Sequence, residues 1–295
     1  MTIAIFGEAL FDVFPGGKKV AGGAPFNVAW HIHGFGAPVR FISRLGNDEL
    51  GKAFFKLLKN ADFPTQAIQQ SKTKPTGQVE VTLDNGEPSY EIKQDVAYDE
   101  IAPDNFDEPY DLLYHGTLAL RTETSLKALE AARTKAARVF MDVNLRDPFW
   151  EKSTVLSLAK NADWVKVNQD EFQILAGEPY NEESARALLS SLELEGLLIT
   201  LGEKGACVYT AADQQCATVL PKPQQTMVDA VGAGDAFSAV FIFGLLHNWP
   251  MQAIMSRAQS FASHILSIEG ATSEDAEFYT PFRQAWHTDE TAAEL

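Results

Sequence analysis

Short apolar segments alternate with longer amphipathic ones along most of this chain, and this alternation restricts the possible folds more than any other feature. The segments 138–143 and 196–200 are mostly apolar and are typical of buried strands. The segments 124–137 and 181–192 predict helices between such strands. A chain that returns through a helix after each strand builds a mostly parallel sheet with helices on both faces. We therefore expect an α/β fold that binds its ligands at the carboxyl ends of the strands.

The segment 76–99 has a different pattern, because valine and leucine alternate there with polar residues. Asp84-Asn85-Gly86 predicts a turn at its middle, so the segment is expected to form a hairpin with one buried and one solvated face. This hairpin interrupts the strand-helix alternation. We expect a single domain, 1–295, with a small β-sheet lid formed by the inserted segments 10–21 and 72–100.

The composition excludes several classes of function. The chain has 295 residues, 24 basic and 40 acidic, and a formal net charge of −16, which disfavours nucleic acid and anionic membranes as partners. Its two cysteines, Cys207 and Cys216, fit a reducing compartment. Glu8 and Asp12 interrupt the first apolar stretch, and the longest one, 236–246, is shorter than the ~20 residues that span a bilayer. We expect a soluble, cytoplasmic protein.

The run from Asp229 to Asp235 is the strongest indication of chemistry. It contains the small residues Gly232, Ala233 and Gly234, and an apolar helical segment follows at once. Small residues allow backbone N–H groups to approach an anion, and the start of a helix adds the positive end of its dipole. A carboxylate beside a phosphate site is unfavourable unless it has a role there, such as accepting a proton from an attacking hydroxyl.

Asp235 has two interpretations that spacing alone does not separate. Aspartate is a common helix N-cap, and it is also a suitable base for phosphoryl transfer. A dinucleotide-dependent oxidoreductase is disfavoured, since Phe237 stands where the G-x-G-x-x-G fingerprint needs its third glycine.

The run 229–235 resembles the C-terminal signature of the ribokinase-like (PfkB) sugar kinases, D-T-x-G-A-G-D, with Ala230 in place of the threonine. The segment 22–29, followed by 44–48, is similar to the N-terminal signature of the same family. The resemblance implies a three-layer ribokinase-like fold with a small β-sheet lid. It also implies that Asp235 is the catalytic base and that the backbone of 232–235 binds the transferred phosphate.

The N-terminal signature implies the sugar site. Paired glycines let a substrate lie against the backbone, and Asn27 offers both a donor and an acceptor to a hydroxyl. Asp12 lies between aromatic residues, where a carboxylate needs a partner. For either glycine alone, a simple strand-to-helix turn remains the alternative. The resemblance assigns the sugar to Asp12, Gly22, Gly23 and Asn27.

Further matches imply the nucleotide and metal sites. Asn168-Gln169-Asp170-Glu171 resembles the family's N-x-x-E motif, which organises phosphates and Mg²⁺ through water, although helix capping explains the same pattern. The segment 200–205 resembles the T-x-G-x-x-G loop, for which a plain hairpin turn is the alternative. The residues implied for ATP are Asn168, Thr200, Gly202, Gly205 and Gln259, with Glu171 for Mg²⁺.

The resemblance also implies a monovalent cation, K⁺, beside the anion site. Asp229 and the Val231 carbonyl are the candidate ligands, with oxygens near Gly270. The unpaired strand edge expected in the lid suggests a homodimer, since such edges are usually covered.

The acceptor is expected to be a sugar, with fructose first, because Gly23-Ala24-Pro25, the run 142–146 and Trp150 are most similar to the fructokinase-type branch. A 2-keto-3-deoxygluconate-type sugar acid kinase is the alternative, for which Arg121, Arg146, Tyr90 and Tyr98 would face a carboxylate. A ribose or nucleoside kinase and a binding protein without turnover are further alternatives. Arg146 contacts the substrate or the phosphate, or else forms a surface ion pair with Asp142 or Asp147. His115, at the end of an expected strand, is a candidate substrate contact.

Overall fold

The computed structural model describes residues 1–84, 87–103, 108–213, 216–220 and 231–293. Within them, nine strands form a central sheet in the order β13-β12-β11-β10-β9-β8-β1-β4-β5. All neighbours pair in parallel except β11 with β12 and β12 with β13. The strands are β1 Ile3–Phe6, β4 Val39–Gly46, β5 Ile68–Ser71, β8 Leu112–His115, β9 Val139–Asp142, β10 Trp164–Asn168, β11 Gly196–Thr200, β12 Ala206–Thr210 and β13 Ala217–Val219.

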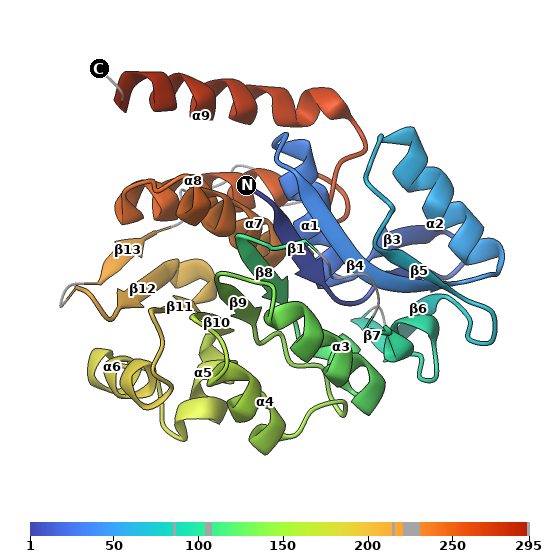
Figure 1. Cartoon of the computed structure of the whole chain (residues 1–295), viewed down its shortest axis with the longest axis horizontal. Coiled ribbons are helices and arrows are strands. Elements are labelled where there is room, and N and C mark those ends of the chain that lie inside the picture. The colour runs from blue at the N-terminus through green and yellow to red at the C-terminus, as the bar shows by residue number, and fades with distance from the viewer. Residues whose placement is uncertain (85–86, 104–107, 214–215, 221–230, 294–295) are drawn as a thin grey trace.

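Helices cover both faces of this sheet (Figure 1). One face carries α1 Ala24–Gly34, α2 Glu49–Asn60, α7 Ala233–Leu246, α8 Met251–Ile265 and α9 Thr280–Ala293. The other carries α3 Glu123–Arg133, α4 Lys152–Ala159, α5 Gln169–Ala176 and α6 Glu182–Ser191. Four short 3₁₀ helices connect these elements: η1 Ala97–Glu100, η2 Leu118–Leu120, η3 Gly202–Lys204 and η4 Ala276–Tyr279.

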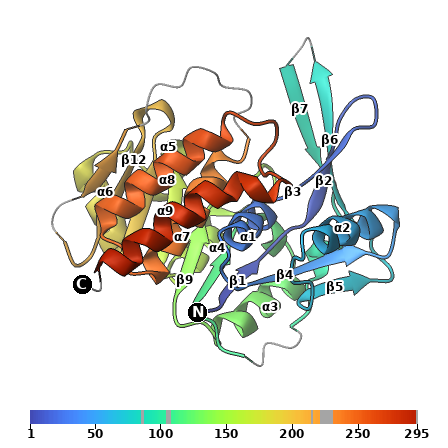
Figure 2. The same cartoon turned by 90° about the horizontal axis from the view of Figure 1, so that it is seen from above.

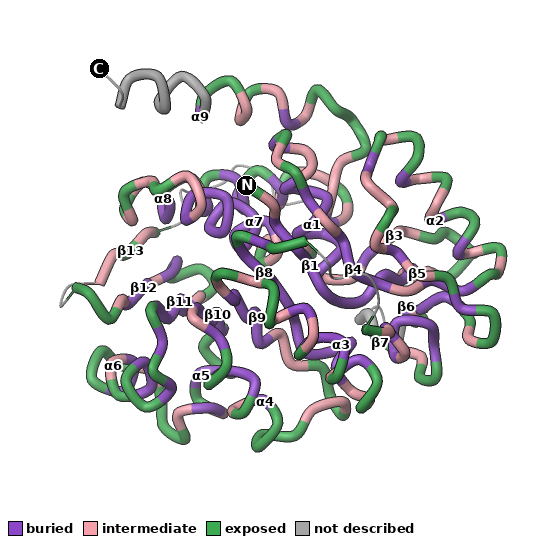
Figure 3. The backbone as a smooth tube through the Cα atoms, viewed as in Figure 1, coloured by how far each residue is buried: buried purple, intermediate pink, exposed green. Residues whose placement is uncertain are grey.

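The apolar core therefore has two halves, one on each side of the sheet. In β1, Ile3 and Ile5 pack into the half beneath α1 and α7, whereas Ala4 and Phe6 pack into the half beneath α3 and α5. Successive strand residues point to opposite faces, so a strand buried on both sides must be apolar throughout. Figure 3 shows the middle strands running through the buried interior. The predicted α/β fold is confirmed, because the sheet is mostly parallel and helices lie on both faces.

A second, four-stranded sheet projects from the core at one side (Figure 2). Its strands are β2 Leu10–Val13, β3 Lys19–Gly22, β6 Gly77–Asp84 and β7 Glu87–Ile92, in the order β3-β2-β6-β7. The hairpin expected in 76–99 is present, since β6 and β7 pair antiparallel with Asp84 opposite Glu87. The turn residues Asn85 and Gly86 lie outside the described residues. The division of the chain into one domain with an inserted lid stays a prediction.

Two helices begin within the signature segments. Helix α1 begins at Ala24, with Pro25 in its first turn, where a missing N–H costs nothing. Helix α7 begins at Ala233, because Gly232 adopts φ 81° as its N-cap. In both places the signature residues belong to the first turn of a helix. None of the described helices is both long and apolar enough to cross a membrane.

Candidate active site

The two signatures meet where the first turns of α1 and α7 lie together. Asn27 Nδ2 donates a hydrogen bond of 2.8 Å to Asp235 Oδ2, across 208 positions of sequence. Asn27 is buried, and Asp235 is partly exposed. The structure thus brings together the residues that the sequence assigned separately to the acceptor and to the anion.

The first turn of α7 leaves backbone N–H groups without an acceptor inside the helix. A Cβ atom at Gly232 would lie 2.3 Å from Ala271 Cβ, so only glycine fits there. The hydrogen bond from Ala236 N to Gly232 O, at 2.8 Å, belongs to the first full turn. The N–H groups of Ala233, Gly234 and Asp235 precede it and have no acceptor within the helix. With the positive end of the helix dipole, they can bind a phosphate oxygen.

The surroundings of Asp235 raise the pKa of its carboxyl group. It is the third residue of α7, after the N-cap Gly232, so the N-cap interpretation does not describe it. Burial raises the pKa of Asp235 to about 6, and the hydrogen bond from Asn27 opposes this rise. The negative charge of Asp142 raises the pKa further, while Lys166 and Arg146 lower it. A carboxylate with such a pKa is ionised at neutral pH and more basic than a solvated one.

A buried ion pair supports this turn from below. Lys166 Nζ lies 2.7 Å from Asp142 Oδ2, and both side chains are almost fully buried. Ser238 Oγ lies 3.0 Å from Asp142 Oδ2 and 3.0 Å from the Gly234 carbonyl oxygen. The network therefore ties β9 and β10 to the first turn of α7. Sequence analysis missed this role, although the signal was there: Asp142 and Lys166 are charged residues within expected core strands.

The paired glycines lie against two acidic side chains. A Cβ at Gly23, where φ is 108°, would be 2.7 Å from the Glu8 carbonyl oxygen and 3.1 Å from Glu8 Cγ. A Cβ at Gly22 would be 3.0 Å from Asp12 Oδ2. Burial raises the pKa of Glu8 to about 7 and that of Asp12 to about 6. The glycines thus make room for carboxyl groups, and Glu8 is one that sequence analysis did not assign.

Arg146 is the cation that faces this acidic group. Its charge lowers the pKa of Glu8, Asp12 and Asp235. Its Nη1 donates to the Leu145 carbonyl oxygen at 3.3 Å, and no ion pair to a carboxylate within 4 Å is present among the described residues. The surface ion pair considered for Arg146 is therefore not formed. Asp142 pairs with Lys166 instead, and Asp147 accepts a hydrogen bond from the Trp150 indole.

A cavity of about 860 Å³ opens beside the acidic group, between the lid and the core. Asp12, Gly22 and Asn27 line one part of it, and Val231 and Gly270 line another. Lys18 of the lid forms an ion pair with Glu269 at this cavity. Asp229, the other candidate ligand for K⁺, lies outside the described residues, as does Ala230.

The residues predicted for ATP lie on β10, β11 and α8 and at the two ends of η3. Asn168 and Thr200 are register partners at the carboxyl ends of β10 and β11. Gly205 adopts φ 86°, and a Cβ there would be 1.9 Å from the Val219 carbonyl oxygen, while Gly202 adopts φ 59°. Gln259, on α8, donates to Ser263 Oγ at 3.3 Å.

Glu171 forms a capping box with Asn168 at the start of α5. Its Oε2 accepts from the Asn168 N–H and its Oε1 from the Leu145 N–H, both at 2.8 Å. Glu171 thereby fixes the loop that carries Arg146. Among the described residues no group of three or more His, Cys, Asp or Glu could hold a metal ion. The remaining lone pairs of Glu171 fit Mg²⁺ bound through water and nucleotide phosphates.

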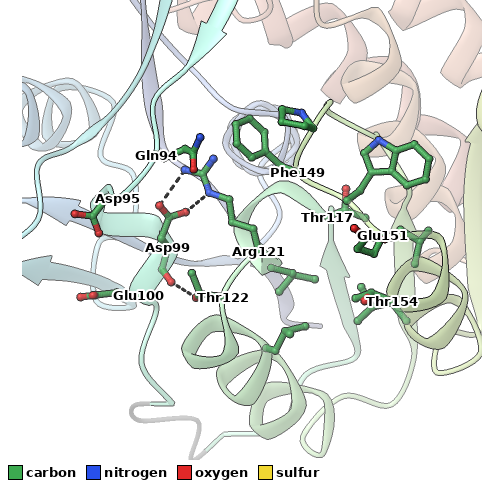
Figure 4. Close-up of a pocket in the computed structure, with 16 residues that line it drawn as sticks. Gln94, Asp95, Asp99, Glu100, Thr117, Arg121, Thr122, Phe149, Glu151 and Thr154 are labelled. Atoms are coloured by element: carbon green, nitrogen blue, oxygen red, sulfur yellow. Dashed lines mark hydrogen bonds and ion pairs between the residues drawn. The ribbon is translucent and has the colours of Figure 1, made fainter.

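A second cavity, of about 570 Å³, lies beside η1 and the loop after β9 (Figure 4). Arg121 lines it, but its guanidinium is already bound: Nε lies 2.5 Å from Asp99 Oδ1 and Nη2 lies 2.9 Å from Asp99 Oδ2. The same guanidinium stacks on Phe149, with 4.7 Å to the ring centroid, and on Tyr98. Arg121 is therefore neutralised by Asp99 and is not a free counter-ion for a substrate carboxylate.

His115 ends β8, but its side chain is buried. Burial lowers the pKa of His115 to about 4, and Nδ1 lies 2.9 Å from the Gly116 carbonyl oxygen. The imidazole is thus neutral at physiological pH and packed inside the protein.

The mostly parallel sheet with a second small sheet, and the meeting of the two signature turns at Asn27 and Asp235, fit a phosphotransferase of the ribokinase-like class. Residues 13–277 match the pfkB family carbohydrate kinase profile. The chain belongs to this family and is a carbohydrate kinase, an enzyme that phosphorylates a sugar hydroxyl.

Several relatives of the chain are named as fructokinases. The chain is 31% identical to fructokinase-2 of Solanum habrochaites, over 86% of this chain and 85% of the relative. It is 32% identical to the probable fructokinase-4 of Arabidopsis thaliana, over 80% of this chain and 79% of the relative. A fructokinase structure from Vibrio cholerae O395, bound to fructose, ADP and a potassium ion, is 26% identical with a TM-score of 0.79, covering 95% of this chain and 97% of that one. The chain is thus a fructokinase-like sugar kinase.

Proposed function

We propose that this enzyme transfers the γ-phosphoryl group of ATP to a hydroxyl of fructose. The hydrogen bond between Asn27 and Asp235 carries the proposal, because it joins the sugar-side turn to the anion-binding turn. The similarity to fructokinases supports fructose as the acceptor.

Asp235 is the general base of the proposed reaction. Its carboxylate accepts the proton of the attacking hydroxyl while the new O–P bond forms and the bond to the ADP oxygen breaks. Asn27 holds the carboxylate toward the acceptor. The N–H groups of Ala233, Gly234 and Asp235 stabilise the charge of the transferred group.

The other side chains hold the two substrates. Asp12 and Asn27, against the exposed backbone of Gly22 and Gly23, bind the sugar, and Arg146 supplies positive charge near the reacting groups. ATP lies along Asn168, Thr200, Gly202, Gly205 and Gln259, with its γ-phosphate at the first turn of α7. Bound Mg²⁺ neutralises phosphate charge, and it is held through water near Glu171. The Val231 carbonyl and Asp229 are the candidate ligands for K⁺, whose positive charge would help to hold the phosphates.

A sugar acid would need a free cation in the protein to bind its carboxylate. Arg121 cannot supply this charge, because Asp99 already neutralises it. A neutral sugar suits the site better, since the carboxyls of Glu8, Asp12 and Asp235 would repel a second carboxylate. Lid closure over the cavity excludes water that would otherwise hydrolyse ATP.

We further propose that the enzyme works in the cytoplasm as a homodimer formed through the exposed edge of the lid. Tyr90, which is 54% exposed on β7 of the lid, supports an interface there. Sedimentation of a stable monomer at micromolar concentration would contradict the dimer.

A coupled ADP-release assay tests the substrate. Fructose, ribose, 2-keto-3-deoxygluconate and adenosine are compared with ATP and Mg²⁺, with and without K⁺. We expect the highest kcat/KM for fructose. Preference for the sugar acid or the nucleoside would overturn the assignment of fructose, and ATP consumption without any acceptor dependence would overturn the kinase reaction.

A further inference from the structure

Glu8 is a buried carboxylate without a full set of partners. It follows β1 and is 3% exposed. Its Oε2 has no hydrogen-bond partner among the described residues. A carboxyl group removed from water without hydrogen bonds destabilises the fold, so such an atom in a native protein requires an explanation.

Glu8 lies against the paired glycines that the sequence assigns to the sugar site. Its Cγ lies against Gly23, where a Cβ would approach to 3.1 Å. Asp235 raises its pKa and Arg146 lowers it, so both charges act on this carboxyl. Tyr98, Tyr114 and Arg121, from η1, β8 and the end of η2, are the other ionisable groups on which the charge of Glu8 acts.

A second unpaired acceptor lies close by. Asn27 Oδ1 is buried and has no partner among the described residues, while Asn27 Nδ2 is bound to Asp235. Gly23 separates Glu8 from the first turn of α1, which carries Asn27. Two unpaired oxygens beside one backbone turn require donors, and adjacent hydroxyl groups of a sugar supply them.

We propose that Glu8 is a further sugar-binding residue, whose unpaired oxygen accepts a hydrogen bond from a hydroxyl of the acceptor other than the one that is phosphorylated. This inference rests on the proposed phosphorylation of a sugar. Glu8 thereby selects polyhydroxylated ligands and, through the bound sugar, orients the reacting hydroxyl toward Asp235. Gly23 is required because any side chain there would displace Glu8.

The test uses Glu8→Met, which keeps the length of the side chain but removes the acceptor, and Glu8→Gln, which keeps an uncharged acceptor. Glu178→Gln, at an exposed position between α5 and α6, is the matched control. We expect Glu8→Met to raise the KM for fructose about tenfold to a hundredfold, with the KM for ATP unchanged. Its melting temperature is expected to equal or exceed that of the wild type, since a buried unpaired carboxyl has been removed.

Fructose analogues that each lack one hydroxyl sharpen the test. The analogue that lacks the hydroxyl bound by Glu8 should bind poorly to the wild type. Its affinity should fall no further in Glu8→Met, because both changes remove the same hydrogen bond. Additive losses for every analogue, or a KM for fructose within about twofold of the wild type, would overturn the role of Glu8. A lower melting temperature with an unchanged KM would also overturn it and indicate a structural role.

Calorimetric binding of fructose without ATP separates this inference from the proposed function. If the wild type binds fructose but does not phosphorylate it, the proposed reaction fails, and the affinities of the Glu8 variants still decide the inference. If the wild type neither binds nor phosphorylates any of the sugars, both proposals fail.

Discussion

Carboxylates lie in two regions around the first turn of α7. The ion pair of Asp142 and Lys166 lies beneath the turn and is called the floor, and the acidic group of Glu8, Asp12 and Asp235 lies beside it and is called the pocket side. The two regions differ in how completely their carboxylates are hydrogen-bonded. On the floor, Asp142 is 2% exposed and meets Lys166, Ser238 and Tyr114. On the pocket side, Glu8 is 3% exposed and keeps one oxygen unpaired, and Asn27 keeps its carbonyl oxygen unpaired. A satisfied network stabilises a structure, whereas unsatisfied acceptors are free to bind a ligand. The difference distinguishes the support of the site from the site itself.

The largest expected effect comes from Asp235 on the pocket side. Asp235→Asn removes the base but keeps the shape of the side chain, and we expect kcat to fall about a thousandfold, with sugar and ATP binding retained. The melting temperature should not decrease, because burial disfavours the carboxylate. The measurement is ADP release at saturating substrates, with calorimetry for binding.

Glu183→Gln is the control for that experiment, since Glu183 is an exposed acid in the first turn of α6. Its turnover should match that of the wild type. Turnover by Asp235→Asn within about tenfold of the wild type would rule out a general base at this position.

A second effect is expected in stability, on the floor side. Asp142→Asn leaves Lys166 buried without its counter-ion, and we expect a loss of about 3 kcal/mol or more in the free energy of unfolding. Urea denaturation measures it. Asp142→Asn combined with Lys166→Met should recover part of the loss, because no uncompensated charge remains.

The matched control for the floor is Asp95→Asn, which breaks the exposed ion pair with Lys74. It should cost about 1 kcal/mol or less. If Asp142→Asn costs no more than this control, the buried pair is not a support of the site.

The smallest expected effect is the dependence on pH. As pH rises through the acidic range, kcat/KM should increase while the stability of the folded state decreases. Asp235 acts as a base in its ionised form, so kcat/KM should fall about tenfold for each pH unit below about 6. The pKa of Glu8 and of Asp235 is higher in the folded state than the intrinsic values of 4.5 and 3.8. The folded state therefore binds more protons between those intrinsic values and the raised ones, and its stability decreases as pH rises through that window.

Melting temperatures of the ligand-free protein, measured at about pH 5 and pH 7, test the second half of this prediction. Glu8→Gln should reduce the difference, since it removes one of the carboxyl groups whose pKa is raised in the folded state. A Glu8→Gln protein with the full pH dependence would show that other acidic residues cause it.

Much of the fold followed from local patterns. The strand-helix alternation predicted the mostly parallel sheet, and the polar-apolar alternation of 76–99 predicted the hairpin of the lid. Strands β5 and β13 were not predicted, because β5 has a single apolar residue among its four and β13 has only three residues. Helix α5 was indicated only through the capping alternative for 168–171, and the structure shows that capping box at its start.

The site was predicted less completely than the fold. The signatures indicated Asp235, Asn27 and the paired glycines, and their assigned roles stay predictions. The ion pair of Asp142 and Lys166 and the position of Glu8 were not predicted, because they depend on how separate strands align. Arg121 was a candidate for a substrate carboxylate, but Asp99 already binds it.

The sequence by itself determined the class of fold and the two turns that carry the chemistry, because strand periodicity and glycine-rich turns act over a few neighbouring residues. Only the tertiary structure decided which polar groups are paired. Asn27 and Asp235 are 208 positions apart and meet at 2.8 Å, and Lys166 lies 24 positions from Asp142 and neutralises it at 2.7 Å. Pairing depends on burial and on distances across the sheet, which packing of the whole chain sets. The same packing leaves Glu8 with one oxygen unpaired.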